Sequence, residues 1–332
     1  MADPARVLVN GGTGFLGSAL VHALVARGET VRVLARSASD LSVLDGLEVE
    51  VVRGDVLQPE TLSFATDGVD VVYHLAGMLG RFGVPYSAYH ALHVDGTCNL
   101  LRACAGQNLR RFVHCSSPGM LGAVAPGDPP RDETSAHHPT GPYERSKSAS
   151  EKAALPLAVE LDLPLVIVRP EFVYGRGDRH VVGLFRAIQQ GRFFYIGSGE
   201  TVCHPSYIDD VVAGLLVCAT ECARPGQVYH ICGPRPVSFC EFAGAIADAL
   251  GVGAPRLRLP TWLVRAGAWG AELAGRTLSI DPPMTLETVR FFAESRAFSI
   301  AKARLELGWS PEVEIAEGTR RSVAWYREQG ML

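Results

Sequence analysis

Short apolar runs alternate with longer amphipathic stretches through the first half of the chain. The apolar runs have the length of strands, and they cover residues 6–10, 30–35, 47–54, 70–76, 111–117 and 164–170. Both faces of their pleat are apolar, which is typical of strands in a sheet that is covered on both sides. Amphipathic stretches predict a helix after each of the first five runs, beginning near Gly14, Ser39, Pro59, Pro85 and Thr140. This alternation predicts an α/β fold, a doubly wound parallel sheet with right-handed crossovers.

The pattern changes after Pro170. Residues 171–226 are rich in glycine, proline and aromatic side chains, and most of 238–328 reads as helix. One late apolar run, 227–233, is expected to rejoin the sheet. The sequence therefore predicts one domain from residues 1–170 and 227–233. A smaller, mostly helical region, from 171–226 and 234–332, is expected to cap the carboxyl end of the sheet and bind substrate.

Composition and charge exclude several classes of protein. The chain of 332 residues is 47% hydrophobic and 20% charged, and its net charge is −4. These values indicate a globular protein without a field that would attract nucleic acid. None of the eight cysteines forms a C-x-x-C pair, so we expect buried free thiols, a reducing compartment and no metal site. The amino-terminal segment enters a strand directly, and we therefore expect a cytoplasmic protein.

The segment "PTWLVRAGAWGAELAG" is the most apolar stretch of the second half. It carries Arg265 and Glu272 and is too short and too charged to span a bilayer. Trp262 and Trp269, seven residues apart, are compatible with weak association with a membrane surface. We expect them instead to pack against the body of the protein.

A glycine-rich turn follows the first predicted strand, in the sequence "NGGTGFLG". Gly11, Gly14 and Gly17 are three residues apart, Phe15 and Leu16 lie between the last two, and a helix follows at once. Glycine lets the backbone approach a pyrophosphate closely, and a helix amino terminus supplies N–H groups and a positive dipole end. This pattern predicts a dinucleotide site, although its spacing differs from G-x-G-x-x-G. The alternative is a tight turn without a ligand.

The ends of the next three strands supply further candidates for cofactor binding. No acidic residue ends the second strand, where Arg36 is expected to pair with a 2′-phosphate, so NADP(H) is preferred and NAD(H) remains open. The alternative is an ordinary exposed arginine. Asp55 follows the third strand and is a candidate acceptor for adenine or a helix amino-terminal residue. The remaining candidates at these strand ends are Val56, Leu75, Ala76 and Gly77.

A tyrosine precedes a lysine by four residues in "GPYERSK", although the chain has only three lysines. On a helix from about 140 to 161, Tyr143 and Lys147 share one face. A nearby ammonium favours the phenolate, so Tyr143 is a candidate general acid or base for an alcohol–ketone pair. Ser116 and Ser117 end the fifth strand and are candidates for a second donor to the substrate oxygen.

With these motifs the sequence resembles an extended short-chain dehydrogenase/reductase of the NAD-dependent epimerase/dehydratase group. The resemblance rests on "NGGTGFLG", "HCSSPGMLG", "YERSK", "RPEFVYGRGD", "HPSYIDDVVAGLL" and "KARLELGWSP", and it spans nearly the whole chain. It implies a Rossmann-type fold and a catalytic set of Ser117, Tyr143 and Lys147. It also implies that the segment with Pro170, Phe172 and Val173 borders the nicotinamide.

Three departures from the family pattern refine the prediction. Phe172 replaces an asparagine, and Cys203 replaces a diphosphate-binding arginine, of the members that act on nucleotide-sugars. In both features the chain is more similar to 3β-hydroxysteroid dehydrogenase-like and dihydroflavonol reductase-like members, which act on apolar alcohols and ketones. His93 also replaces an asparagine. Its role is either to take part in a proton relay or to cap the local structure.

The sequence thus predicts an NADP(H)-dependent oxidoreductase that acts on a hydrophobic alcohol or ketone of sterol, isoprenoid or flavonoid type. A nucleotide-sugar epimerase with tightly bound NAD and a non-catalytic NADP-sensing protein are the alternatives. The sequence is compatible with a homodimer. It identifies neither the substrate nor the redox direction.

Overall fold

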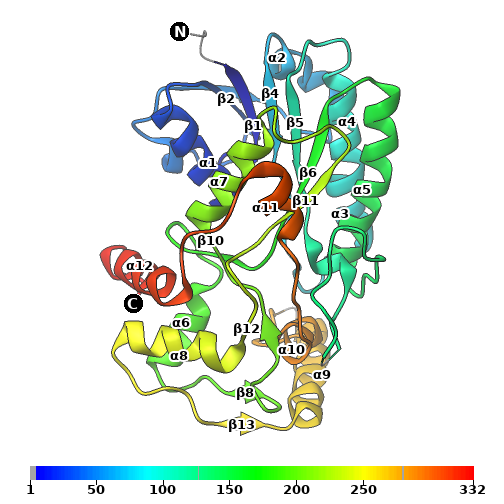
Figure 1. Cartoon of the computed structure of the whole chain (residues 1–332). Helices are drawn as coiled ribbons and strands as arrows, with labels where there is room; N and C mark the ends of the chain where they lie inside the picture. The colour runs from blue at the N-terminus through cyan, green and yellow to red at the C-terminus, as the bar shows by residue number, and fades with distance from the viewer. Residues whose placement is uncertain (1–4, 126, 279) are drawn as a thin grey trace.

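Seven parallel strands form the central sheet of the computed structural model, which describes residues 5–125, 127–278 and 280–332 (Figure 1). The strand order is β11-β6-β5-β4-β1-β2-β3, the Rossmann order with one strand added. The strands are β1 (Arg6–Asn10), β2 (Thr30–Ala35), β3 (Val49–Arg53), β4 (Val71–His74), β5 (Arg111–Cys115), β6 (Leu165–Pro170) and β11 (Val228–Ile231). The predicted α/β class and all seven predicted strands are confirmed.

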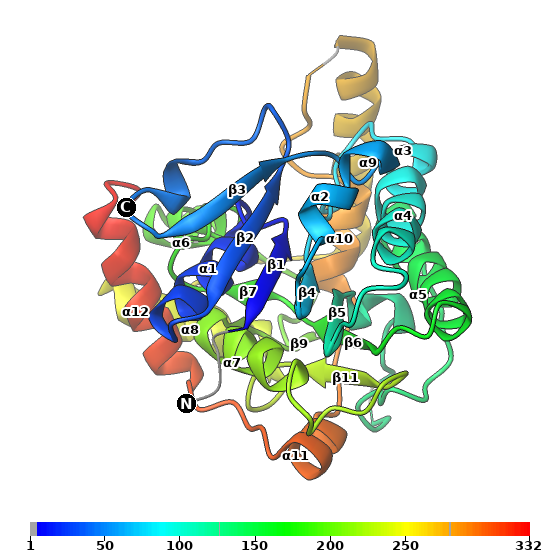
Figure 2. The same cartoon turned by 90° about the horizontal axis from the view of Figure 1, so that it is seen from above.

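Helices cover both faces of this sheet (Figure 2). Val7 and Val9 point to the face covered by α1 (Phe15–Ala26) and α7 (Ile208–Cys218), whereas Leu8 points to the opposite face. That second face is covered by α2 (Ser63–Thr66), α4 (Gly96–Ala103) and α5 (Pro142–Glu160). A short helix α3 (Tyr86–His90) continues into α4 through one wide turn, Ala91–Asp95. Burial on both faces explains why the strands are apolar throughout.

The helix predicted near Ser39 is wrong. The connection contains only one 3₁₀ turn, Ser42–Leu44, because Asp40 accepts a hydrogen bond from the backbone N–H of Ser42 at 2.9 Å. Such a local bond stabilises a turn at the expense of helix. The stretch near Pro59 is likewise short, with a 3₁₀ turn Pro59–Thr61 before the four residues of α2.

The second region forms a lobe beyond the carboxyl ends of the strands, in the lower half of Figure 1. Its helices are α6 (Val182–Gln189), α8 (Phe239–Leu250), α9 (Thr261–Leu278), α10 (Leu286–Ala293) and α12 (Ile315–Glu328), whereas α11 (Ala301–Leu307) returns to the central sheet and packs against β11. Three two-stranded pairs join them: β7 (Val173–Tyr174) with β10 (Ser206–Tyr207), β8 (Tyr195–Ile196) with β13 (Arg258–Leu259), and β9 (Val202–Cys203) with β12 (Val237–Ser238). Within the described ranges, no helix has the length and apolar character needed to cross a membrane.

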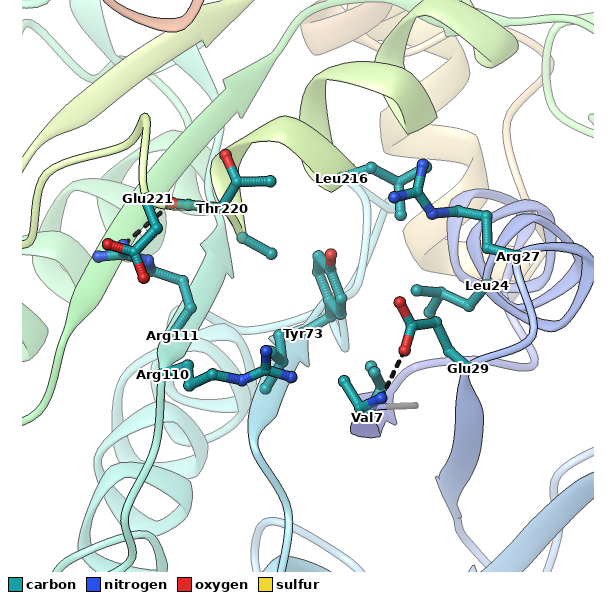
Figure 3. Close-up of a pocket in the computed structure, with 13 residues that line it drawn as sticks. Val7, Leu24, Arg27, Glu29, Tyr73, Arg110, Arg111, Leu216, Thr220 and Glu221 are labelled. Carbon is teal, nitrogen blue, oxygen red and sulfur yellow. Dashed lines mark hydrogen bonds between the residues drawn. The ribbon is translucent and has the colours of Figure 1, made fainter. Parts of the chain in front are cut away.

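Different cavities lie at the two ends of the parallel strands, which we call the carboxyl edge and the amino edge of the sheet. The strand order reverses between β1 and β4, and at such a point a crevice opens at the carboxyl ends of the strands. At the opposite, amino edge, a cavity of about 270 Å³ lies between β1, β4, β5 and the ends of α1 and α7 (Figure 3). Tyr73 stands in its centre, and Arg27, Arg110 and Arg111 surround it together with Glu29 and Glu221.

Candidate active site

A cavity of about 510 Å³ occupies the crevice at the carboxyl edge. The loops after β1, β4, β5 and β6 line one side of it, and the lobe closes the other through α10. It brings together most of the residues singled out from the sequence: Gly11, Gly14, Phe15, Leu16, Gly17, Leu75, Gly77, Ser116, Ser117, Tyr143, Lys147, Pro170, Phe172 and Val173. Segments as far apart in the sequence as Gly11 and Val173 therefore meet in one site.

The glycine turn has the geometry of a phosphate cradle. Gly11 has φ of +88°, and a Cβ there would lie 2.6 Å from the backbone nitrogen of Ala76. A Cβ on Gly17 would clash with the backbone oxygen of Gly11. Gly14 precedes α1 as its N-cap, so the first N–H groups of that helix face the cavity wall. The residues present thus fit a dinucleotide with its pyrophosphate at the helix amino terminus.

Helix α5 positions the tyrosine and the lysine. Its first turn is fixed by Glu144, which accepts hydrogen bonds from the backbone of Thr140 at 2.7 Å and of Gly141 at 3.2 Å. Tyr143 therefore lies in the first turn, where the helix dipole favours negative charge. Lys147 follows one turn later, and its Nζ donates to the backbone oxygen of Cys115 at 2.9 Å.

Burial dominates the acid–base behaviour of both groups. It raises the pKa of the Tyr143 phenol well above its usual range, an effect that nearby Cys115 reinforces and that a hydrogen bond from Ser117 opposes. Burial also lowers the pKa of Lys147. The phenol is thus protonated in this structure, and a nearby cation would be needed to bring its pKa down toward neutrality.

His93 supports the wall of this cavity. Its Nε2 accepts a hydrogen bond from the backbone N–H of Met78 at 3.0 Å, so its Nδ1 carries the proton and donates to Ser146 Oγ at 2.7 Å. Burial lowers the pKa of His93 to about 2, so the ring stays neutral. Because both nitrogens are engaged within the wall, the structure favours the structural role of His93 over a proton relay.

An acidic cluster that the sequence reading missed lines the substrate side of the cavity. It consists of Glu144, Glu171, Glu287 and one guanidinium, Arg296. Arg296 donates to Glu144 at 2.8 Å. Burial raises the pKa of Glu171 to about 7 and also raises that of Glu287. Glu144 and Arg296 are 152 residues apart, so their pairing leaves no signal in local sequence spacing. Glu171, in contrast, follows the predicted cofactor residue Pro170 and could have been predicted as a site residue.

Gly119 marks where this cluster approaches Ser117. A Cβ on Gly119 would lie 3.0 Å from Arg296 Nη1, 3.4 Å from Ser117 Oγ and 3.8 Å from Glu171 Oε2. The three polar groups therefore surround one small residue. Arg296 and Glu171 therefore lie beside Ser117 in the cavity wall.

Phe172 forms an apolar part of the cavity wall beside the cluster. Its ring packs against Phe242 and Phe291, with centroids 5.5 Å and 5.1 Å away. The backbone of Phe172 has φ of +38°, a left-handed conformation that is an outlier for a bulky residue. Cys203, which replaces the diphosphate-binding arginine of the nucleotide-sugar members, is only 3% exposed and is not among the residues that line the cavity.

Four predicted cofactor residues lie outside the cavity wall: Arg36, Asp55, Val56 and Ala76. Arg36 is exposed just beyond β2, and its backbone oxygen accepts from Arg53 Nη1 at 2.7 Å, which brings a second guanidinium beside it. Asp55 Oδ1 accepts from the backbone N–H of Leu57 and closes a turn, and it is not a helix amino-terminal residue, since the 3₁₀ helix that follows begins at Pro59. Val56 is buried against Gly96.

Comparison with known proteins agrees with the fold and the motifs of this site. The profile described as "NAD dependent epimerase/dehydratase family" matches residues 7–232, and the chain belongs to this family. It is 32% identical to a 2-alkyl-3-oxoalkanoate reductase from Stenotrophomonas maltophilia (strain K279a), over 95% of this chain and 98% of the relative. It is 28% identical to a 3 beta-hydroxysteroid dehydrogenase/Delta 5-->4-isomerase from Mycobacterium tuberculosis (strain CDC 1551 / Oshkosh), over 97% and 90%.

Among solved structures, that of gox2253 is 29% identical and covers 99% of both chains with a TM-score of 0.83. The predicted membership in the extended short-chain dehydrogenases/reductases is confirmed. The protein is accordingly an NAD(P)-dependent oxidoreductase of this superfamily.

Proposed function

We propose that the protein is an NADP(H)-dependent reductase that converts a ketone on an apolar molecule into a secondary alcohol. The charge of the substrate side of the cavity carries this proposal. Three carboxyl groups, Glu144, Glu171 and Glu287, line it, and the one guanidinium among the described lining residues, Arg296, already pairs with Glu144. A diphosphate there would meet no unpaired guanidinium and would be costly to desolvate.

The apolar wall supports a hydrophobic substrate. Met78, Leu79, Phe172 and Phe291 line the same cavity. Each methylene of the substrate that is buried against them contributes about 0.8 kcal/mol. Sterol-, isoprenoid- or flavonoid-like ketones match this wall.

In the proposed reaction the dinucleotide supplies the hydride. Tyr143 donates its proton to the carbonyl oxygen, and Ser117 orients that oxygen with a second hydrogen bond. Lys147 holds the nicotinamide ribose, and its ammonium stabilises the tyrosinate that remains after the proton has left.

The paired arginines beyond β2 and β3 support NADP(H) as the cofactor. Arg36 and Arg53 are both exposed at the carboxyl edge, joined by the hydrogen bond of Arg53 to the Arg36 backbone. Two guanidinium groups suit the charge and the planar geometry of a 2′-phosphate.

Calorimetry with cofactor-saturated protein tests the proposal. We expect micromolar binding of a neutral apolar ketone and none of a UDP-hexose, with oxidation of NADPH on addition of the ketone. Micromolar binding of the UDP-hexose without binding of apolar ketones would instead favour an epimerase.

A 3-oxo acid is the third ligand to test, beside the apolar ketone and the UDP-hexose. It belongs to the substrate class that appears in the name of the Stenotrophomonas relative. Its carboxylate would lie among Glu171, Glu287 and Arg296, so its affinity should rise as the pH falls through about 7 and Glu171 takes up a proton. An affinity that does not change with pH would exclude contact between that carboxylate and Glu171.

A further inference from the structure

Helix α9 buries one side and leaves an apolar side uncovered. Val264, Ala268 and Gly275 are buried, and the first two pack in a small core with Ile196 and Val289. On the opposite side Trp262 is 71% exposed, Trp269 62% and Leu273 51%. The expectation that both tryptophans pack against the body was therefore wrong.

The exposed residues form a continuous strip along the helix. Trp262, Ala266, Trp269 and Leu273 follow one another at spacings of four, three and four, which places them on a single face. We call them the α9 strip. In Figure 2 the helix projects from the rim of the molecule, and no described segment covers it there. An outward face this apolar is unusual for an exposed helix and indicates a binding surface.

The charges beside the α9 strip indicate what binds there. Arg265 and Arg276 lie beside it and are exposed, and Arg276 also approaches Glu272 at 3.9 Å. The acidic residue of the helix, Glu272, is turned inward, where its side chain is 14% exposed and accepts a hydrogen bond from the backbone of Leu286. Residues 256–281 carry four arginines against two acidic side chains, although the whole chain has a net charge of −4. The surface is thus locally positive on a negative protein.

We propose that α9 docks the protein on an anionic lipid surface, with the α9 strip inserted at the headgroup level. Tryptophans on the apolar face and arginines beside it are the features of helices that lie in a membrane interface. A second copy of the chain fits less well, because an isologous contact would bring the two positive flanks together.

The position of α9 connects this surface with the cavity. Arg276 lies over the ring of Phe82, 6.0 Å from its centroid, in the segment that follows the cavity-lining Met78 and Leu79. Helix α10, which packs against α9, contributes Glu287 and Phe291 to the cavity. A docked α9 would hold the cavity beside the bilayer, where apolar molecules concentrate. The docking itself does not depend on the identity of the substrate.

Co-sedimentation with vesicles tests the docking. We expect binding to an equal mixture of phosphatidylcholine and phosphatidylglycerol and weaker binding to phosphatidylcholine alone. The double variant Trp262→Ser/Trp269→Ser should lower the partition coefficient at least about tenfold on both vesicles. Arg265→Gln/Arg276→Gln should lower it about fivefold per arginine on the mixed vesicles and leave phosphatidylcholine unaffected.

Leu305→Ser is the matched control, because Leu305 is 86% exposed on α11 and should be replaced without effect. Unchanged thermal stability of each variant shows that the fold is intact. Lack of binding of the wild type to both vesicles would overturn the proposal, and so would an equal loss with Leu305→Ser. Sedimentation velocity that shows a tryptophan-dependent dimer without vesicle binding would assign the α9 strip to a second copy instead.

Discussion

The two edges of the parallel sheet carry cavities with similar residue types and different arrangements. Each contains a tyrosine with arginine and glutamate side chains near it, Tyr143 at the carboxyl edge and Tyr73 at the amino edge. At the amino edge the arginines pair with groups around the rim of the cavity: Arg111 donates to the backbone oxygen of Thr220 at 3.0 Å (Figure 3), and Arg110 lies 3.8 Å from Asp70.

At the carboxyl edge the polar groups come from the loops after four strands and from the lobe, which is built from later parts of the sequence. They face one space beside a glycine turn and a helix amino terminus. The residue types alone therefore do not mark the site. What distinguishes it is that the ends of several strands direct hydroxyl, ammonium and carboxyl groups at one point.

Removing one phenolic oxygen at each edge should give the largest difference. We expect Tyr143→Phe to lower turnover by about 10²-fold or more, because the proton donor of the proposed reaction is lost while cofactor affinity is retained. Tyr73→Phe, an equally conservative change at 2% exposure, should stay within a few-fold of wild type. Steady-state kinetics and cofactor titration measure both. Equal losses of turnover for the two variants would show that Tyr143 is not the proton donor.

Glu171 should make stability depend on pH. Its pKa is raised to about 7 by burial, so the folded state binds this proton more tightly than the unfolded chain does. Its contribution is fully present below pH 4.5 and is lost as the pH rises through 7, about 3 kcal/mol in total. Denaturant unfolding between pH 4.5 and 7.5 should show this loss in the wild type relative to Glu171→Gln.

The control for that measurement is Glu221→Gln at the amino edge. Glu221 is exposed and therefore similarly solvated in both states, so its variant should keep the slope of the wild type. If Glu171→Gln also keeps that slope, Glu171 does not hold a proton at neutral pH.

Alanine variants of arginines at the two edges should distinguish a specific contact with the cofactor from an effect of the protein's overall charge. Arg36→Ala should weaken NADP(H) by about 10- to 150-fold, the value of a charge-assisted pair with a 2′-phosphate, and leave NAD(H) almost unchanged. Arg53→Ala should act in the same direction. Arg110→Ala at the amino edge should change neither affinity. Fluorescence titration of both cofactors decides, and equal losses for NADP(H) and NAD(H) would show that Arg36 only stacks on adenine.

The sequence predicted the parts of the molecule that local patterns encode. Periodicity located all seven strands, and the glycine turn and the spacing of Tyr143 and Lys147 located residues that meet in one cavity. The pair of Glu144 and Arg296 was missed because it joins residues 152 apart. The exposed face of α9 was misassigned because an apolar face gives the same periodicity whether the protein or another surface covers it.

Backbone strain offers the smallest and most local comparison, since one non-glycine residue with positive φ stands near each edge. Phe172 has φ of +38° at the carboxyl edge, and Asp162 has φ of 52° in the loop before β6. Aspartate tolerates this conformation through local hydrogen bonds, whereas a phenylalanine there costs about 1–2 kcal/mol. The ring contacts with Phe242 and Phe291, each contributing about 0.5–1.5 kcal/mol, offset that cost.

Glycine and alanine variants separate the two contributions, because both remove the ring and only alanine keeps the Cβ. In ordinary backbone alanine is the more stable by about 0.5–1 kcal/mol. At position 172 we expect the reverse, with Phe172→Gly about 1 kcal/mol more stable than Phe172→Ala in denaturant unfolding. Asp162→Gly and Asp162→Ala should show the same order. If Phe172→Ala is the more stable variant, the wall of the site is not strained, and the ring packs there without the opposing cost.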